Sequence, residues 1–484
     1  MTLSDVLPAG ADLNSFIADG VWNAGNGDRV PLLSPWDGSQ RAVIVGGGAA
    51  GVTEAVRVAK QAFSGNESAT LAARIGWIER AAAALEAMEG DIVAALVGDI
   101  GKPRRASTFE AKRTVAFMRA VAAEVQGLRG EMLPLDVSAT GANRLGFVQR
   151  LPYGVVAAVT PFNAPANLLM QKVAPALVTG NAVIVKPAPE GTRVALIIAE
   201  AFRKAGLPAG LYGVVPGGAA EALALAADGG VSVVTITGGT AAGEALARAA
   251  GAKKFIGELG GNSPNIVLKD ADLADAAQRI AASAFEASGQ QCISAQRIIV
   301  EAAVHDEFLK AFAAAAAKLK VGDPNSPDVD LGPVVHARSA DRIMASIERS
   351  IAAGAKLALG GERQGCMISP TILADAPLDA PIVCEEIFGP VAVVLKVADA
   401  AEALATANAS EFGLQGAVFT HNLDDALKIA GGLRVGSVWI NEGSRFRLDN
   451  YPFGGMGKSG HGREGVRYAL EEYTQLKFTG IRLA

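Results

Sequence analysis

The chain has 484 residues, of which 50% are hydrophobic and 19% are charged, and its formal net charge is −5. This length exceeds what one hydrophobic core normally supports, so two or three domains are expected. Charges of both signs are scattered and no run approaches about 20 apolar residues, so the sequence argues against nucleic-acid binding and against a membrane span.

The N-terminal part is predicted to be an irregular lead-in over residues 1–40, followed by a short strand over residues 41–45. Residues 46–51 then match the GxGxxG pattern that links a strand to a helix in dinucleotide-binding folds. The pattern arises easily in a chain rich in glycine and alanine, and no acidic residue ends a strand about twenty residues later. A glycine-rich turn is the preferred interpretation, and a phosphate-binding loop is the alternative.

Helical periodicity dominates the next region, with one apolar face over residues 71–85 and further helices up to about Gln126. The sequence Gly101-Lys102-Pro103 interrupts this pattern and predicts a break between two helices. Residues 127–150 contain glycine, proline and polar residues between two apolar pieces. They are predicted to form an extended, hairpin-like excursion from the main body.

From Gly154 onward, short apolar strands alternate with helices in two series, which predicts an α/β fold with open parallel sheets covered on both faces. The boundary between the two series is expected near residues 253–261. In the first series we expect strands at 155–160, 182–186, 211–215 and 232–237, with helices from Ala166, Thr192, Ala219 and after Thr240. In the second we expect strands at 265–268, 295–300, near Ile382, 392–395, 417–420 and 437–440, helices from Asp272, His305 and Ala400, and a last strand at 475–481.

The cysteine content indicates a reducing compartment. Cys292, Cys366 and Cys384 are too few for a disulfide framework in a chain of this length. The first twenty residues hold three aspartates and no basic segment, so no secretory signal is recognised. A cytoplasmic location is therefore expected.

Two residues have the chemistry of a nucleophile and a base. Cys292 is preceded by Gly289-Gln290-Gln291, and these polar and glycine neighbours favour a thiol displayed in a cleft. Glu258 ends an apolar strand, where a carboxylate is costly unless it is paired, hydrated or functional. A thiol can attack a carbonyl carbon, and a carboxylate can activate water against the resulting thioester. The alternatives are an inert buried cysteine and a salt bridge at the domain boundary.

Polar side chains also follow the strands of the first series. Asn163 lies in a loop stiffened by Pro161 and Pro165, where its amide can donate to an oxyanion or form an Asx-type turn. Lys186 and Glu190 follow the next strand, at the carboxyl edge where α/β sheets bind ligands. Residues 237–243 form a Gly-rich turn into a helix one strand further on.

Together these motifs resemble the aldehyde dehydrogenase superfamily over nearly the whole chain, in the order typical of that family. The GxGxxG pattern is then a decoy, because this family binds its dinucleotide without that fingerprint. The matching motifs are Thr160–Pro165, Lys172 nine residues after Asn163, Lys186-Pro187, Thr237–Gly243, Glu258–Gly261, Gly289–Cys292, Glu385–Pro390 and Pro452–Gly455.

The resemblance implies an NAD- or NADP-dependent oxidation of a small aldehyde to its acid. Cys292 is implied to attack the aldehyde, Asn163 and the Cys292 backbone N–H to hold the oxyanion, and Glu258 to activate water. Lys172 and Glu464 occupy positions associated with proton relay, and Phe453 lies at the substrate funnel. The residues implied to contact the cofactor are Thr160, Pro161, Lys186, Glu190, Gly238, Gly239, Thr240, Gly243, Leu259, Glu386 and Phe388. No metal site is expected.

The resemblance also implies a domain organisation. Two Rossmann-like open-sheet domains are expected, one binding the cofactor (residues 1–126 and 150–257) and one catalytic (258–460). A small β oligomerisation element (127–149 and 461–484) predicts a homodimer or homotetramer.

The sequence departs from the family pattern in three places. Pro189 stands where NAD-preferring members often have a glutamate, so the choice between NAD and NADP stays open. Gly239 replaces a serine frequent in its loop. Arg445 and Arg447 precede the funnel, and one of them is hypothesised to face an anionic group on the substrate. Pairing with Asp449 or a subunit contact is the alternative.

Two other functions are kept as alternatives. A CoA-acylating semialdehyde dehydrogenase is disfavoured by Glu258, because acylating relatives tend to lack that base. A catalytically silent structural or binding protein on the same fold is disfavoured by the joint presence of Cys292, Asn163 and Glu258.

Overall fold

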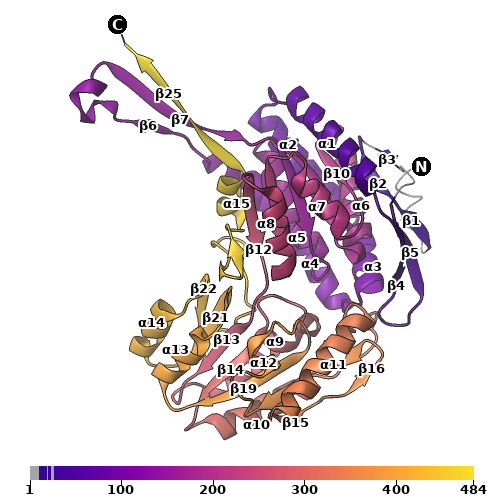
Figure 1. Cartoon of the computed structure of the whole chain (residues 1–484), viewed down its shortest axis with the longest axis vertical. Helices are drawn as coiled ribbons and strands as arrows, with labels where there is room; N and C mark the ends of the chain where they lie inside the picture. Colours follow the sequence, from indigo (N-terminus) through magenta and orange to yellow (C-terminus); the bar gives the residue numbers. More distant parts are fainter. Residues whose placement is uncertain (1–9, 19, 23–26, 484) are drawn as a thin grey trace.

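The computed structural model describes residues 10–18, 20–22 and 27–483. Two α/β bodies lie one above the other, and a long β arm projects from the first of them (Figure 1). The predicted α/β class with two parallel sheets and a small β element is confirmed.

The first sheet has eight strands in the order β24-β12-β11-β8-β9-β10-β2-β3. Its five central strands are parallel, as their short apolar sequences predicted, while the strands at both edges are antiparallel. The strands are β2 (Ser15–Ile17), β3 (Gly20–Trp22), β8 (Val155–Thr160), β9 (Ala182–Pro187), β10 (Tyr212–Val214), β11 (Val233–Thr237), β12 (Lys254–Glu258) and β24 (Gly460–His461).

Helices α1 to α8 accompany this sheet (Figure 1), and their buried apolar residues form one continuous core with its strands. Helix α5 is buried along its whole length, so both of its ends are fixed by the surrounding structure. The helices are α1 (Gly48–Gly65), α2 (Leu71–Ala87), α3 (Glu89–Ile100), α4 (Arg104–Glu124), α5 (Pro165–Val178), α6 (Thr192–Lys204), α7 (Ala219–Ala227) and α8 (Thr240–Ala250).

The described part of the N-terminal lead-in is more ordered than predicted. In this region β1 (Ala11–Leu13) and β4 (Arg29–Leu33) pair with β5 (Gln40–Val45) in a separate sheet. Strands β1 and β4 are too short for their hydrophobic pattern to be recognised in the sequence. The predicted irregularity of this region is therefore wrong. The GxGxxG strand, β5, lies outside the eight-stranded sheet, and its turn packs on the loop before α7, where Gly47 N–H donates to the Pro216 carbonyl.

The second sheet has seven strands in the order β15-β18-β19-β14-β13-β21-β22, parallel except for β15. The predicted strand near Ile382 is wrong, because Pro381 starts the short helix α12 there and Ile382 fills the core of this body. The strands are β13 (Ser263–Val267), β14 (Ala295–Glu301), β15 (Lys356–Leu359), β18 (Thr371–Ala374), β19 (Val391–Val397), β21 (Gln415–Phe419) and β22 (Ser437–Ile440). The helices are α9 (Leu273–Phe285), α10 (His305–Ala316), α11 (Ala337–Ala352), α12 (Pro381–Cys384), α13 (Ala400–Asn408) and α14 (Leu423–Gly432).

The projecting arm is a three-stranded antiparallel sheet in the order β25-β7-β6 (Figure 1). Its strands are β6 (Glu131–Leu133), β7 (Arg144–Pro152) and β25 (Thr474–Arg482), and helix α15 (Val466–Glu472) connects β25 to the body. Two small ladders complete the fold: β16 (Arg363–Gln364) with β17 (Met367–Ile368), and β20 (Phe412–Gly413) with β23 (Met456–Gly457). Within the described residues, no helix is long and apolar enough to cross a membrane.

Candidate active site

The carboxyl ends of the parallel strands in the first sheet bring several predicted residues to one edge. Strands β12, β11, β8 and β9 are neighbours, and they end at Glu258, Thr237, Thr160 and Pro187. Thr237 lies directly opposite Glu258, and Thr160 lies opposite Pro187. This is the edge at which open α/β sheets bind ligands.

The loop that carries Cys292 arrives at this edge from the second body. It leaves α9 through Ala287, Ser288 and Gly289, which have φ values of 52°, 56° and 66°. Three successive left-handed residues are strained for alanine and serine, and the Ser288 hydroxyl stabilises the turn by donating to the Gly332 carbonyl at 2.7 Å. A Cβ on Gly261 would lie 1.9 Å from the Cys292 carbonyl oxygen, so only glycine lets the two segments approach this closely.

The Cys292 side chain packs in a small apolar cluster with Ile293, Leu414, Tyr451 and Phe453. Burial, together with the nearby charge of Glu386, raises the pKa of the Cys292 thiol to about 12. The resting side chain is therefore a neutral thiol at physiological pH, and it must lose its proton to become a nucleophile.

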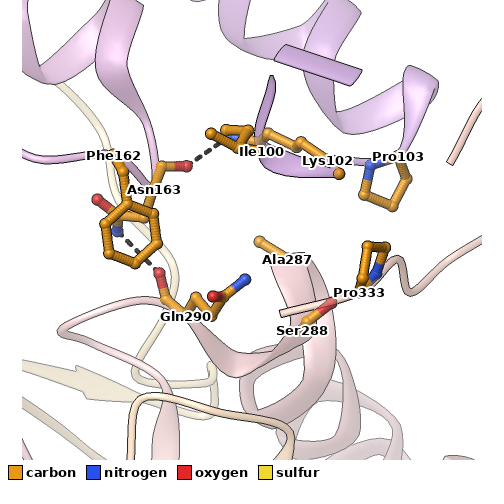
Figure 2. Close-up of a pocket in the computed structure, with 10 residues that line it drawn as sticks. Ile100, Lys102, Pro103, Phe162, Asn163, Ala287, Ser288, Gln290 and Pro333 are labelled. Carbon is orange, nitrogen blue, oxygen red and sulfur yellow. Dashed lines mark hydrogen bonds between the residues drawn. The ribbon is translucent and has the colours of Figure 1, made fainter. Parts of the chain in front are cut away.

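Asn163 reaches the same loop from the first body. Its side-chain amide donates to the backbone carbonyl of Gln290 at 2.8 Å, two residues before Cys292 (Figure 2). The Gln290 side chain in turn accepts from Val335 N–H at 2.9 Å, which fixes this part of the loop. An amide carries two N–H donors, so this hydrogen bond orients the group and leaves a second donor.

Glu258 lies at the end of β12, where it is 2% exposed and neither carboxylate oxygen has a hydrogen-bond partner among the described residues. Burial and the charge of Glu464 raise the pKa of Glu258 well above its usual range, against the opposing effects of Lys172 and Arg447. An elevated pKa makes the ionised form of such a carboxyl a stronger base, and its two unused oxygens leave it free to bind water.

Glu464 is held differently. It accepts from Lys172 at 2.9 Å and from Arg447 at 2.8 Å, and it is 3% exposed. Burial alone would raise the pKa of Glu464, but Lys172 and Arg447 outweigh it and hold the pKa at about 2. The two carboxyls therefore differ: Glu464 is a fixed anion, while Glu258 favours its neutral form.

Lys186, one of the predicted cofactor residues, is 7% exposed and lies one residue before the end of β9. Burial lowers the pKa of Lys186, and the charges of Glu221 and Glu190 oppose that shift. Glu190 lies in a single 3₁₀ turn just after Pro189. Thr160 and Pro161 follow the neighbouring strand.

The turn at residues 238–243 leads into α8 at an uncapped helix start. Gly239 is the N-cap, it has no side-chain cap hydrogen bond, and a Cβ built there would meet no atom within 4 Å. A helix N-terminus with unused N–H groups and open space attracts a phosphate, so this turn fits the diphosphate of a dinucleotide. Gly243 packs against Leu259, and the Thr240 hydroxyl donates to the Lys458 carbonyl at 3.2 Å.

Glu386 and Phe388 approach from the second body. Glu386 accepts from Gly261 N–H at 2.9 Å, and burial raises the pKa of its carboxyl to about 7 despite that hydrogen bond. Phe388 adopts φ 50° and its ring meets Phe162 edge-on, with centroids 5.8 Å apart. Both bodies thus line the space beside Cys292.

Arg445 and Arg447 each form an ion pair with a glutamate, and neither pairs with Asp449, which was the alternative to a substrate contact. Arg447 places its guanidinium 3.6 Å from the centre of the Phe453 ring and binds Glu464. Arg445 binds Glu286 and lines a separate cavity of about 420 Å³. Asp449 is occupied by Arg113 at 2.7 Å and by Gln171 at 2.8 Å.

Several residues of this region were not found from the sequence. Arg113 and Gln171 lie on helices α4 and α5, where a polar residue looks like part of a solvated face. Lys102 was seen only as part of a helix break, although its ammonium lies 3.1 Å from the Asn163 carbonyl. Glu110 had a usable signal, since it falls on the buried face of α4 between Ser107 and Ala111.

The described residues hold no group of three or more His, Cys, Asp or Glu side chains that could bind a metal ion. The two α/β bodies thus bring a thiol, an amide and a buried carboxyl to one edge of the first sheet.

Residues 22–479 match the model of the aldehyde dehydrogenase family, and the chain belongs to that family. It is 36% identical over 433 residues to 3-sulfolactaldehyde dehydrogenase of Priestia aryabhattai, covering 89% of this chain and 90% of the relative.

Three solved structures match this fold over nearly their whole length. Aldehyde dehydrogenase 21 from Physcomitrella patens, in complex with the reaction product succinate, is 33% identical with a TM-score of 0.93 and covers 98% of each chain. NADP-dependent glyceraldehyde-3-phosphate dehydrogenase from Bacillus halodurans, complexed with NADP, is 35% identical with a TM-score of 0.95, covering 97% of this chain and 99% of that one. NAD-dependent aldehyde dehydrogenase from Sinorhizobium meliloti is 31% identical with a TM-score of 0.94, covering 100% and 96%.

The protein is thus an aldehyde dehydrogenase that oxidises an aldehyde to the acid with NAD or NADP. The predicted family, enzyme class and cofactor type are confirmed.

Proposed function

We propose that Cys292 is the nucleophile, Glu258 the water-activating base and Asn163 an oxyanion donor in a hydrolytic aldehyde oxidation. The observation that carries the proposal is the pair of unpartnered oxygens on buried Glu258, close enough to Cys292 for its charge to affect the thiol pKa. A base without a fixed partner is free to bind and deprotonate water.

In the first half of the reaction, the Cys292 thiol gives up its proton to solvent water and the sulfur forms a bond to the aldehyde carbon. The aldehyde oxygen becomes an oxyanion, stabilised by the second N–H of the Asn163 amide and the backbone N–H of Cys292. Bound NAD(P) would supply the hydride acceptor. As the hydride leaves this carbon, the oxyanion re-forms the C=O bond and a thioester remains on Cys292.

In the second half, Glu258 takes a proton from water, and the resulting hydroxide attacks the thioester carbon. The carbon–sulfur bond breaks, the acid leaves, and the sulfur returns as Cys292. Glu464, held as an anion by Lys172 and Arg447, raises the pKa of Glu258, so the Glu258 carboxylate, once ionised, is a stronger base toward water.

The residues that would hold NAD(P) come from both bodies. The α8 turn at Gly238, Gly239 and Thr240 would hold the diphosphate, with Gly243 and Leu259 packed behind it. Lys186, Glu190 and Glu386 would bind ribose hydroxyls, Phe388 would pack on the nicotinamide, and Thr160 and Pro161 would line the site. This makes the first body the cofactor-binding domain (residues 1–126 and 150–257) and the second the catalytic domain (258–460).

Product analysis tests the hydrolytic function directly. With an oxidisable aldehyde and NAD or NADP, the enzyme is expected to release one free acid per reduced cofactor, at the same rate with and without CoA. Formation of an acyl-CoA, or dependence of turnover on CoA, would show that the chain is an acylating dehydrogenase instead.

The substrate is proposed to be a small aldehyde with an anionic group. Arg447 lies against Phe453, beside the apolar cluster that holds Cys292, and its Nε is buried without a partner among the described residues. The Nε of Arg445 is also unpartnered within the described chain. Sulfolactaldehyde and succinate, named for two similar proteins, both carry an anionic group.

A comparison of an anionic and a neutral aldehyde of the same length tests this substrate class. In Arg447→Met, kcat/KM for the anionic aldehyde is expected to fall about 10- to 100-fold, because a charged hydrogen bond contributes about 1.5–3 kcal/mol. The value for the neutral aldehyde should fall by a smaller factor, since only the part of the effect that acts through the Arg447–Glu464 pair remains. The same comparison in Arg445→Met identifies which of the two guanidiniums gives the preference for the anionic aldehyde. Equal kcat/KM for both aldehydes in the wild type would rule the anion site out.

The arm is proposed to join subunits into a homodimer or homotetramer. It exposes a series of large apolar side chains that isolated proteins rarely present to water. These are Met132, Val137, Leu145, Leu476, Phe478 and Ile481. Light scattering that gives the mass of a single chain would contradict this. The three cysteines are free, which favours a reducing cytoplasm as the place of work.

A further inference from the structure

The helix break at residues 101–103 contacts the Asn163 loop directly. Gly101 ends α3 with φ 70°, and a Cβ there would lie 2.4 Å from Pro333, so this position requires glycine. Lys102 follows, and its side chain is only 9% exposed. Its ammonium donates to the backbone carbonyl of Asn163 at 3.1 Å and also to the Glu110 carboxylate.

Glu110 binds the other end of the Asn163 loop, where helix α5 begins. Its side chain is 4% exposed, and one carboxylate oxygen binds Lys102. The other oxygen accepts from the N–H groups of Ala166 at 2.9 Å and Asn167 at 3.2 Å, which are in the first turn of α5. An anion at a helix N-terminus satisfies N–H groups that have no partner within the helix.

Asn163 is therefore fixed on both sides. Its carbonyl is bound by Lys102 from the first body, and its amide binds the Gln290 carbonyl in the second (Figure 2). Figure 2 shows both hydrogen bonds: the one from Lys102 lies within the first body, and the one to Gln290 joins the first body to the second. The short loop between β8 and α5 is thus held at Asn163 by Lys102 and at its end by Glu110.

We propose that Lys102 and Glu110 are positioning residues that set the Asn163 amide for the oxyanion. This rests on the proposed role of Asn163. Neither side chain needs to touch substrate: the ion pair fixes the loop, and the loop fixes the direction of the amide. A shift of about 1 Å in such a donor lowers the rate about 100-fold, so small loosening of this loop has a large effect on chemistry.

The test is a double-mutant cycle between Lys102→Met and Asn163→Ala, measured as the single-turnover rate of cofactor reduction. Lys102→Met is expected to lower that rate about 10- to 100-fold in the wild type, with little change in KM for NAD(P). In the Asn163→Ala background the same substitution should have almost no further effect, because the amide it positions is gone.

Two further variants keep the result interpretable. Lys102→Met alone leaves Glu110 as a buried, unpaired charge, so Lys102→Met/Glu110→Gln removes both charges and keeps an acceptor for the α5 N–H groups. It should fold with a normal melting curve and still show the slow single turnover. The matched control is Lys112→Met. Lys112 is an exposed lysine on α4, the helix that carries Glu110, and its substitution should leave the rate unchanged.

The outcomes separate the two claims. If Asn163→Ala reduces cofactor at the wild-type rate, the oxyanion role of Asn163 is wrong. If Asn163→Ala is slow but the lysine substitution has no effect, or has the same effect in both backgrounds, Asn163 keeps its role and the positioning proposal is wrong.

Discussion

Cys292→Ser is expected to lower kcat/KM for the aldehyde by about 10⁴-fold or more. Serine keeps the size of the side chain and the packing against Ile293 and Phe453, so the apolar cluster should survive. The hydroxyl is a far weaker nucleophile than a thiolate and a poor leaving group from an ester. Reduced cofactor measured at 340 nm, with aldehyde in excess, gives the rate.

The matched control for this prediction is Cys384→Ser. Cys384 is exposed, and its thiol only donates to the Leu378 carbonyl at 3.1 Å, so this variant should keep wild-type activity. Loss of activity in both variants would point to a general effect of removing a thiol. Activity of Cys292→Ser within about tenfold of the wild type would mean that another group attacks the aldehyde.

Glu258→Gln is expected to separate the two halves of the reaction. Glutamine has the same shape and leaves Cys292 and Asn163 in place, so the first turnover should still release one reduced cofactor per active site. Steady turnover should then fall about 10²- to 10⁴-fold, because glutamine cannot deprotonate water. Stopped-flow absorbance resolves the burst from the slow phase.

The control for this substitution is Glu244→Gln, since the Glu244 side chain on α8 is 49% exposed. It should show neither a burst nor a change in steady rate. A normal steady rate in Glu258→Gln would mean that another base activates the water. Loss of the burst as well would place Glu258 in the first half of the reaction, as the group that takes the Cys292 proton.

The regular parts of this fold were predictable because burial on both faces gives parallel strands continuous apolar sequences. Strands β8, β9 and β11 stand out for that reason. Short edge strands such as β1 carry too few residues for periodicity to identify them. Ile382 lies in a short apolar stretch, which favoured a strand. Pro381 starts the helix α12 there instead, because the fixed φ of proline suits the first position of a helix.

Cys292 and Glu258 were singled out because each lies in an unusual local sequence, and their roles stay predictions. The site was not predictable where the effect depends on distant partners. The pairing of Arg447 with Glu464, or of Arg113 with Asp449, joins residues on different elements. The Lys102–Glu110 pair joins a helix break to a helix face. Lys102 also binds the carbonyl of Asn163, which is sixty-one positions away in the sequence.

The covalent intermediate on Cys292 is the most direct test of the mechanism. Glu258→Gln is mixed with aldehyde and NAD or NADP, quenched in acid after the burst, digested and analysed by mass spectrometry. The peptide containing Cys292 is expected to gain the mass of the aldehyde less two hydrogen atoms, as a thioester requires. An unmodified Cys292 peptide after a full burst of reduced cofactor would contradict the account.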